Sequence, residues 1–327
     1  MSGEPTGDDA RVATHAEMLA NRVRKRFAHL SRRFAREGIE AFRLYDWDIP
    51  EVRAVVDWYA GHIVVAEYAR RQTGPEWLPA MGRAAGEALQ VAPDRVHLRL
   101  RRTGAGDGPR YERLASTGRR FPVRERDLTF LVNLDDFLDT GLFPDHRETR
   151  AMVRAMAGGK DFLNLYGYTG SFTCAAAAGG ARSTVTVDRS ATCLDWAADN
   201  LALNRLVGEG HDLVRADANE FLDRAAASRL RFSLAVVDPP SFSTTRGATG
   251  GFDVQRDHPD LLRRVLAVVA PGCTVLFSTN HQRFEPRLEG LSASEVTEIT
   301  EETVPEDYRN RRVHRCFRIT AASSSPT

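Results

Sequence analysis

The feature that most constrains the fold is an alternation of strand-like and helix-like segments that begins after about Gly141. Short apolar runs typical of buried strands are separated by segments whose apolar residues recur every three or four positions. Such alternation is typical of a mainly parallel sheet covered by helices, so we expect an α/β, Rossmann-like domain over residues 141–322. The expected strands are 161–166, 184–187, 212–214, 233–237 and 273–278, followed by a terminal pair at 295–300 and 316–320.

The upstream residues 39–140 have a different pattern and predict a small α+β domain. A helix-like segment, 76–89, interrupts several short strand-like runs, and the glycine-rich stretch 104–108 is typical of a hairpin turn. The runs are 41–44, 63–68, 96–100 and 128–132. Residues 1–20 and the tail 323–327 are expected to be disordered because of their polar composition.

Residues 21–38 predict a basic amphipathic helix. Apolar side chains recur there at steps of three and four, and arginine and lysine occupy the remaining faces. The net charge of the chain is only +1, so binding of nucleic acid has to rest on a local patch of this kind. Arg24, Lys25 and Arg32 are therefore candidate RNA phosphate contacts, and a solvated helix face is the alternative.

Composition excludes several classes of protein. No apolar stretch approaches the roughly 20 residues of a membrane span, and the N-terminus is unlike a signal peptide, so the cytoplasm is the expected compartment. The four cysteines are far apart and form no CxxC pair, which indicates reduced thiols and no metal cluster.

A glycine-containing turn follows the first expected strand of the α/β domain. Gly167 and Gly170 lie between that strand and a helix of small residues, where open α/β sheets bind their ligands. Asp188 ends the second strand, where a carboxylate can accept both hydroxyls of a ribose, and Asp217 follows the third strand, where it could accept from an adenine amino group. This pattern lacks G-x-G-x-x-G and indicates a nucleotide-like cofactor other than a dinucleotide.

The segment Asp238-Pro239-Pro240 ends the fourth expected strand and is followed by Phe242. Two prolines restrict the backbone and predict a rigid shelf against which a planar base can lie. This arrangement resembles the catalytic motif of class I methyltransferases that alkylate nitrogens of bases. The long polar stretch between Pro240 and His258 is interpreted as a lid, in which aromatic side chains could stack on the base.

Many ordered segments of the chain from residue 21 onward resemble one family, the RlmK part of the bacterial bifunctional 23S ribosomal RNA methyltransferase RlmKL. These segments are NRVRKRF, RLYDWDIPE, LDTGLFPDHR, DFLNLYGYTG, ARSTVTVDRS, VVDPPSFS, FDVQRDH and RNRRVHRC. The resemblance implies a class I methyltransferase domain preceded by a small α+β domain. It also implies that S-adenosylmethionine is used to make N7-methylguanosine in 23S ribosomal RNA, as free RNA or in a pre-ribosomal particle.

The resemblance assigns roles to residues at matching positions. It implies that Asp238, Pro239, Pro240 and Phe242 form the substrate side of the site. The implied cofactor contacts are Asn164, Tyr166, Gly167, Gly170, Asp188 and Asp217, with Asp145 and Arg147 in a segment that closes over the cofactor. The bifunctional protein also carries an RNA-binding module and a second methyltransferase, for which this chain has no room, so substrate docking through the basic helix, a partner or another RNA stays open.

Three other activities stay open at this point. Methylation of guanine N2 also suits the Asp-Pro-Pro shelf. Methylation of cytosine C5 would need a cysteine nucleophile, and no cysteine lies in the fourth-strand motif. An RNA-binding module without catalysis is the alternative from another class, and the acids at 188, 217 and 238 argue against it. The oligomeric state is not indicated by the sequence.

Overall fold

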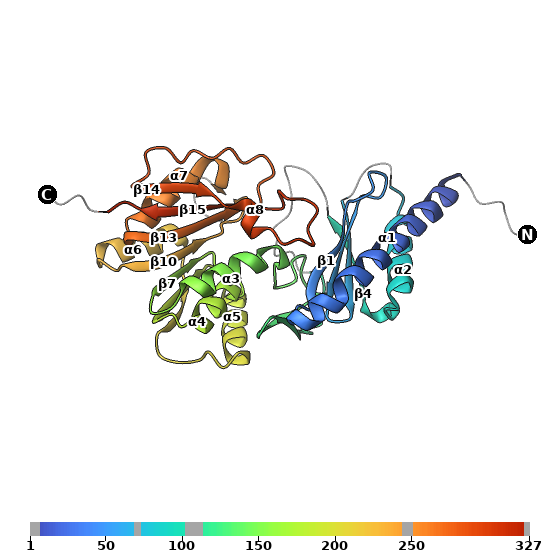
Figure 1. The fold of residues 1–327 in the computed structure, drawn as a ribbon, viewed down its shortest axis with the longest axis horizontal. Helices are drawn as coiled ribbons and strands as arrows, with labels where there is room; N and C mark the ends of the chain where they lie inside the picture. Colours follow the sequence, from blue (N-terminus) through green and yellow to red (C-terminus); the bar gives the residue numbers. More distant parts are fainter. Residues whose placement is uncertain (1–6, 69–72, 102–113, 244–250, 324–327) are drawn as a thin grey trace, which may run out of the picture. The chain divides into compact units, whose positions relative to one another are not determined.

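The computed structural model describes residues 7–68, 73–101, 114–243 and 251–323 (Figure 1). The chain forms two compact units. The first unit contains Met1–Thr140 together with Glu306–Asn310, and the second contains Gly141–Pro305 together with Arg311–Thr327. Within the described ranges, no helix combines the length and apolar character that a membrane span requires.

The first unit is built from two helices, a four-stranded sheet and a hairpin. Its sheet has the order β1-β2-β3-β4, in which only β3 and β4 are parallel, because α2 connects these two strands. The elements of this unit are α1 (Gly7–Glu37), β1 (Ala41–Asp46), β2 (Ala54–Tyr59), β3 (His62–Tyr68), α2 (Trp77–Leu89), η1 (Pro93–Arg95), β4 (Val96–Arg101), β5 (Phe121–Glu125) and β6 (Leu128–Val132). The expected glycine-rich hairpin tip at 104–108 lies outside the described residues.

The N-terminal helix is longer than the sequence predicted. We expected disorder over residues 1–20 and a helix over 21–38, but α1 already begins at Gly7, so the expectation of disorder is wrong for residues 7–20. The physical reason is that its apolar stripe continues upstream: Leu19 and Val23 are fully buried, and Val12 packs against the same core. This burial stabilises a helical segment whose composition is otherwise polar.

The second unit contains a seven-stranded sheet in the order β14-β15-β13-β10-β7-β8-β9. Five of its strands, from β13 to β9 in that order, are parallel, and β15 is antiparallel to both of its neighbours. The strands are β7 (Asp161–Leu165), β8 (Ser183–Asp188), β9 (His211–Arg215), β10 (Phe232–Val237), β13 (Val269–Thr279), β14 (Ala293–Glu298) and β15 (Arg315–Ala321), and the hairpin pair β11 (Phe242–Ser243) and β12 (Phe252–Asp253) lies outside this sheet.

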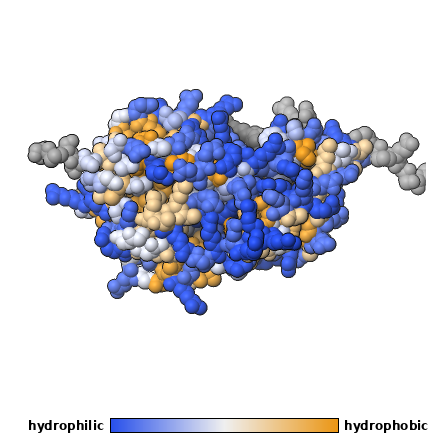
Figure 2. All heavy atoms as spheres, in the orientation of Figure 1, coloured by the Kyte–Doolittle hydropathy of each residue, from blue (hydrophilic) through white to orange (hydrophobic). Residues whose placement is uncertain are grey.

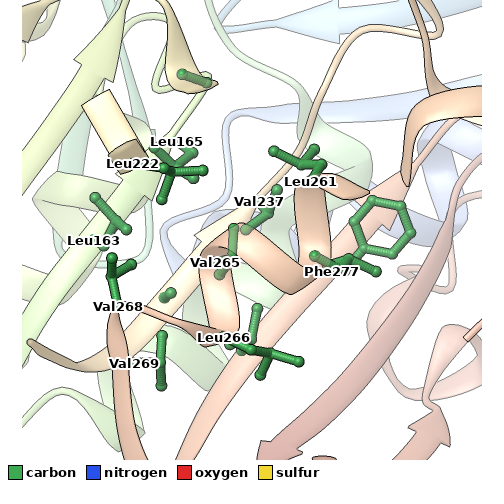
Figure 3. Packing of buried hydrophobic residues seen from close by; sticks show 14 of the residues in the cluster. Leu163, Leu165, Leu222, Val237, Leu261, Val265, Leu266, Val268, Val269 and Phe277 are labelled. Atoms are coloured by element: carbon green, nitrogen blue, oxygen red, sulfur yellow. The ribbon is translucent and has the colours of Figure 1, made fainter. Parts of the chain in front are cut away.

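Helices connect these strands and cover the sheet. They are η2 (Pro144–His146), α3 (Arg147–Met156), α4 (Ser171–Ala178), α5 (Ala191–Leu203), α6 (Ala218–Ala227), α7 (Val254–Leu266) and α8 (Thr300–Thr303). Figure 3 shows how Leu261 and Val265 of α7 meet Val237 and Phe277 of the sheet, and Leu222 of α6 lies beside Leu165 of β7. A second cluster joins Phe162 and Val236 on the other face of the sheet to α3 and α4, so the apolar runs form a buried layer on each face.

Two boundaries in this unit differ from the sequence prediction. The strand expected over 273–278 already begins at Val269, so Pro271 and Gly272 lie in β13, at a register shift where the pairing with β10 is interrupted. Part of the expected lid is also regular structure, because Phe242–Ser243 pairs with Phe252–Asp253 and α7 starts at Val254. Residues 244–250 of that stretch lie outside the described residues.

The segment Glu306–Asn310 belongs to the first unit although the residues on both sides of it belong to the second. Asp307 accepts a hydrogen bond from the backbone N–H of Arg43 at 2.8 Å, and the guanidinium of Arg43 lies over the ring of Tyr308 at 4.3 Å. The backbone N–H of Asn310 donates to Asp46 at 2.7 Å. The chain therefore crosses between the two units three times.

Candidate functional site

The candidate site lies at the point in the sheet where the order in which strands are added changes direction. From β7 the next strands, β8 and β9, are added on one side, whereas β10 and β13 are added on the other. Ligands of open α/β sheets bind beyond the carboxyl ends of the strands at such a switch point. Here the two strands at that point end directly before Tyr166 and Asp238, which the sequence analysis assigned to the cofactor and to the substrate.

The turn between β7 and α4 has an unusual backbone. Tyr166, Tyr168 and Gly170 have φ values of 57°, 48° and 73°, in the left-handed region that tyrosine rarely adopts. The surrounding contacts hold this conformation: the Tyr168 N–H donates to Asp188 at 2.9 Å, and the Asn200 side chain donates to the Thr169 carbonyl at 2.8 Å. Strained backbone of this kind concentrates at ligand-binding sites, which supports the assignment of this turn.

The two glycines of the turn are required by packing within the protein. A Cβ atom on Gly167 would lie 2.3 Å from the γ-methyl of Thr186, and one on Gly170 would lie 2.7 Å from the Cβ of Ala197. The sequence argument explained both glycines by close approach of a ligand. The structure gives a sufficient reason without a ligand, and backbone contact with the cofactor stays a prediction.

Gly167→Ala is expected to destabilise the protein by roughly 1 to 3 kcal/mol, because an added methyl group in a packed interior forces its neighbours apart. Thr186→Ser removes the γ-methyl that causes the clash and keeps the hydroxyl that lies 2.6 Å from Thr173 Oγ1. Urea unfolding of both single variants and the double variant checks this. We expect Thr186→Ser to restore much of the loss, and strictly additive effects would contradict the packing explanation.

Asn164 is an interior residue of this region. It is 1% exposed, and its Nδ2 donates to Thr173 Oγ1 at 2.9 Å, so this nitrogen is used within the protein. The expected contact of Asn164 with the methionine part of the cofactor would therefore have to use its amide oxygen or the second hydrogen of Nδ2. Tyr166 is packed against Phe252 at 5.9 Å between ring centroids, and burial raises the pKa of its hydroxyl.

Asp188 connects two loops at the end of β8. Its Oδ2 accepts from the Tyr168 N–H at 2.9 Å and its Oδ1 from the Ser190 N–H at 2.8 Å. Burial raises the pKa of this carboxyl above its usual value, although the two N–H donors act in the opposite direction. A half-buried carboxylate at this edge is well suited to accept the hydroxyls of a ribose, as the sequence predicted.

Asp217 has a structural role that the sequence did not reveal. It is the N-cap of α6, because its Oδ1 accepts from the N–H groups of Asn219 at 2.9 Å and Glu220 at 3.4 Å. The expected contact with an adenine amino group would therefore have to use Oδ2. The cap and this contact are compatible, since they use different oxygens.

Asp238 is held at the carboxyl end of β10 and keeps 26% of its side chain exposed. The hydroxyl of Ser278, at the end of the neighbouring strand β13, donates to Asp238 Oδ1 at 2.7 Å. Pro239 is buried, and Phe242 is 61% exposed and meets the ring of His281 edge-on at 5.6 Å. The Asp-Pro-Pro segment thus presents a fixed carboxylate beside an exposed aromatic ring.

Two stacked histidines that the sequence analysis did not single out lie near Asp238, and His146 is the one in contact with it. His146 Nε2 is 3.5 Å from Asp238 Oδ2, and the ring of His146 is stacked on that of His314, with centroids 4.2 Å apart and planes 12° apart. His314 Nδ1 is 3.1 Å from Asp145 Oδ2. His314 and His146 are 168 positions apart in the sequence, so no local motif could have joined them.

Asp145, His146 and His314 also resemble a metal-ligand set, because their ligand atoms lie within 4.8 Å of one another. A metal ion lies near the plane of each imidazole that binds it, along the nitrogen lone pair. Two stacked, nearly parallel rings do not direct their lone pairs to one point. The geometry therefore favours a hydrogen-bonded network.

Asp145 and Arg147 lie in the second unit, at the start of α3. Asp145 faces the histidine pair, and Arg147 is 1% exposed with its Nε 3.3 Å from Glu148 Oε1. A guanidinium that is buried to this extent is held inside the protein. Contact of either residue with the cofactor stays a prediction.

The strand order and the polar groups at its switch point define the α/β fold of class I methyltransferases, as the sequence predicted. A model of the family described as S-adenosylmethionine-dependent methyltransferase matches residues 45–299. The chain therefore belongs to that family, and S-adenosylmethionine is its cofactor.

Known relatives and solved structures agree with this assignment. The chain is 43% identical to "Ribosomal RNA large subunit methyltransferase K/L" of Allochromatium vinosum over 93% of this chain and 42% of the relative, and 43% identical to the protein of that name in Syntrophotalea carbinolica over 96% and 45%. It spans less than half the length of these relatives. A solved methyltransferase complexed with SAH has the same fold, with a TM-score of 0.71 and 22% identity over 98% of this chain and 83% of the other.

Proposed function

We propose that this chain methylates a guanine base of 23S ribosomal RNA at N7, with S-adenosylmethionine as the methyl donor. The observation that carries the proposal is the fixed, partly exposed carboxylate of Asp238 on a proline shelf, beside the turn assigned to the cofactor. The ribosomal substrate is supported by the names of the relatives, which describe large-subunit ribosomal RNA methyltransferases.

The reaction requires the protein mainly to align the acceptor atom with the methyl group of the cofactor. The cofactor supplies an electrophilic methyl group on a sulfonium, and guanine N7 carries a free lone pair, so no general base is needed at the acceptor atom. The role left for the protein is to fix the ring. Asp238 can accept from the N1–H or the exocyclic amine of guanine, and Phe242 is available for stacking on its face.

Two of the four cysteines are poor candidates for the nucleophile that methylation of cytosine C5 requires. That reaction needs a thiolate that adds to the base. Burial raises the pKa of Cys174 to about 12, and burial together with the charge of Asp238 raises the pKa of Cys316, so both thiols stay protonated near neutral pH. Methylation of guanine N2 is the remaining alternative, since Asp238 could also orient an exocyclic amine.

The product distinguishes these activities. N7-methylguanosine carries a positive charge on its imidazole ring, and borohydride followed by aniline cleaves the strand there. We expect cleavage at one guanosine of 23S ribosomal RNA after incubation with the protein and S-adenosylmethionine, and also with a variant in which all four cysteines are serine. A methylated guanosine that resists cleavage would establish the N2 alternative, and a methylated cytosine would refute both. Absence of any methylated nucleoside would refute the proposed substrate.

We further propose that α1 provides RNA phosphate contacts. The structure separates the cations of this helix into two groups. Arg22 forms an ion pair with Asp48, and Arg33 forms one with Glu306. The other group, Arg24, Lys25 and Arg32, is exposed and forms no ion pair within the described ranges. Much of the face seen in Figure 2, including the region of α1, is hydrophilic.

Charge reversal at Arg24, Lys25 and Arg32 is expected to weaken binding of ribosomal RNA and to flatten its dependence on salt. Fewer counterions are released on binding, so the slope should fall by about one for each phosphate group that the helix no longer neutralises. Filter-binding measurements over a series of salt concentrations determine this slope. The matched control reverses three exposed arginines of the second unit: Arg224, Arg231 and Arg263. Equal slopes for the α1 variant and the parent would leave α1 as a solvated face.

A further inference from the structure

The contacts of His314 fix where its protons lie. Its Nε2 is 3.0 Å from Thr303 Oγ1, and that hydroxyl already donates its only proton to the Thr300 carbonyl at 3.0 Å. His314 Nε2 must therefore donate to Thr303. Since its Nδ1 faces the Asp145 carboxylate at 3.1 Å, a proton also lies between these two groups. His314 and Asp145 thus form a buried, charge-assisted pair.

The stacked position of His146 then determines its own charge state. A second imidazolium stacked 4.2 Å from the first would be repelled by it. Burial and His314, and more weakly Arg150, lower the pKa of His146, while Asp238 and Asp145 act in the opposite direction. Thr149 Oγ1 lies 3.4 Å from its Nδ1 and can donate to it, which leaves the proton of the neutral ring on Nε2.

We propose that His146 is a positioning residue, which presents its Nε2–H to Asp238 Oδ2 and fixes this carboxylate together with Ser278. The His314–Asp145 pair holds His146 in place and in this tautomer. The inference rests on the proposed function, because it assumes that Asp238 orients the base. It assigns four side chains from three separate segments to the geometry of a single carboxylate: Asp145, His146, Ser278 and His314.

The first test is spectroscopic and does not need activity. In the full chain labelled with 15N-histidine, the resonance that disappears in His146→Gln identifies His146. We expect it to show the neutral tautomer protonated at Nε2. The chemical shift of its Nε2 should change in Asp238→Asn. It should not change in Asp260→Asn, a substitution on the exposed face of α7. The proposal would be overturned if His146 were protonated at Nδ1, if it were an imidazolium, or if the chemical shift of its Nε2 did not change in Asp238→Asn.

The second test is kinetic. His146→Phe keeps the flat ring and removes the donor, so we expect the single-turnover rate of methyl transfer to fall roughly ten- to a hundredfold with unchanged affinity for S-adenosylmethionine. His146→Gln places an amide N–H near the position of Nε2 and should recover most of the rate. A matched control is His211→Phe, since His211 also contacts a threonine, Thr184 of β8, at 3.0 Å. The rate of this variant should equal that of the parent.

The effect should depend on Asp238. In the Asp238→Asn background, His146→Phe is expected to change the rate less than about threefold, because the carboxylate that it positions is gone. Independent losses that multiply would show a general structural role and overturn the inference. If the parent methylates no ribosomal RNA, the proposed function fails, and the tautomer and shift of His146 still decide whether it is bonded to Asp238.

Discussion

Asp188→Ala is expected to weaken the binding of S-adenosylmethionine roughly ten- to a hundredfold, because the substitution removes a charged acceptor for the ribose hydroxyls. Titration calorimetry of the full chain measures this. The variant should also lose some stability, since Asp188 accepts one backbone N–H bond that ties the β7–α4 turn to β8 and a second from Ser190 in the loop after β8. Thermal unfolding has to accompany the titration for that reason.

The matched control for this variant is Asp161→Ala. Asp161 lies at the start of β7, at the opposite end of the same sheet, and accepts from Arg182 and from the Ser183 hydroxyl. It should lose stability and bind the cofactor like the parent. Unchanged affinity in Asp188→Ala would show that the ribose is held elsewhere, and equal weakening in both variants would show that the loss comes from general destabilisation.

Asp238→Asn is expected to lower the single-turnover rate of methyl transfer by roughly a hundredfold, while the affinity for S-adenosylmethionine stays within about twofold. The asparagine keeps the shape of the side chain but loses the charge that strengthens hydrogen bonds to the base edge. Rapid-quench measurements with 23S ribosomal RNA check the rate, with Asp260→Asn as a control outside the site. A parent-like rate would remove Asp238 from the reaction.

The parts of the fold that the sequence predicted are those set by local patterning. Strands β7, β8 and β10 follow from short apolar runs, and Asp188 and Asp238 follow from their place at the ends of such runs. The helix α1 was predicted only in its second half, because its first turns depend on contacts with a distant core that a local window does not include.

The parts that could not be predicted depend on contacts between distant residues. The stack of His146 on His314 and the bond from Ser278 to Asp238 each join separate strands or loops. The requirement for glycine at position 167 also depends on a distant residue, because the atom that excludes a side chain there belongs to Thr186 on the neighbouring strand. Sequence position indicated that these residues matter but not which atoms they contact.

The return of Glu306–Asn310 to the first unit affects how this protein can be divided into modules. A fragment that starts at Gly141 would keep the sheet and the candidate site but would leave Asp307 and the nearly fully buried ring of Tyr308 without their partner Arg43. Conversely, a fragment that ends at Thr140 would lack the residues that Arg43 and Asp46 bind. Each unit is compact by itself, but a division of the chain between Thr140 and Gly141 would separate Arg43 and Asp46 from the segment that they bind.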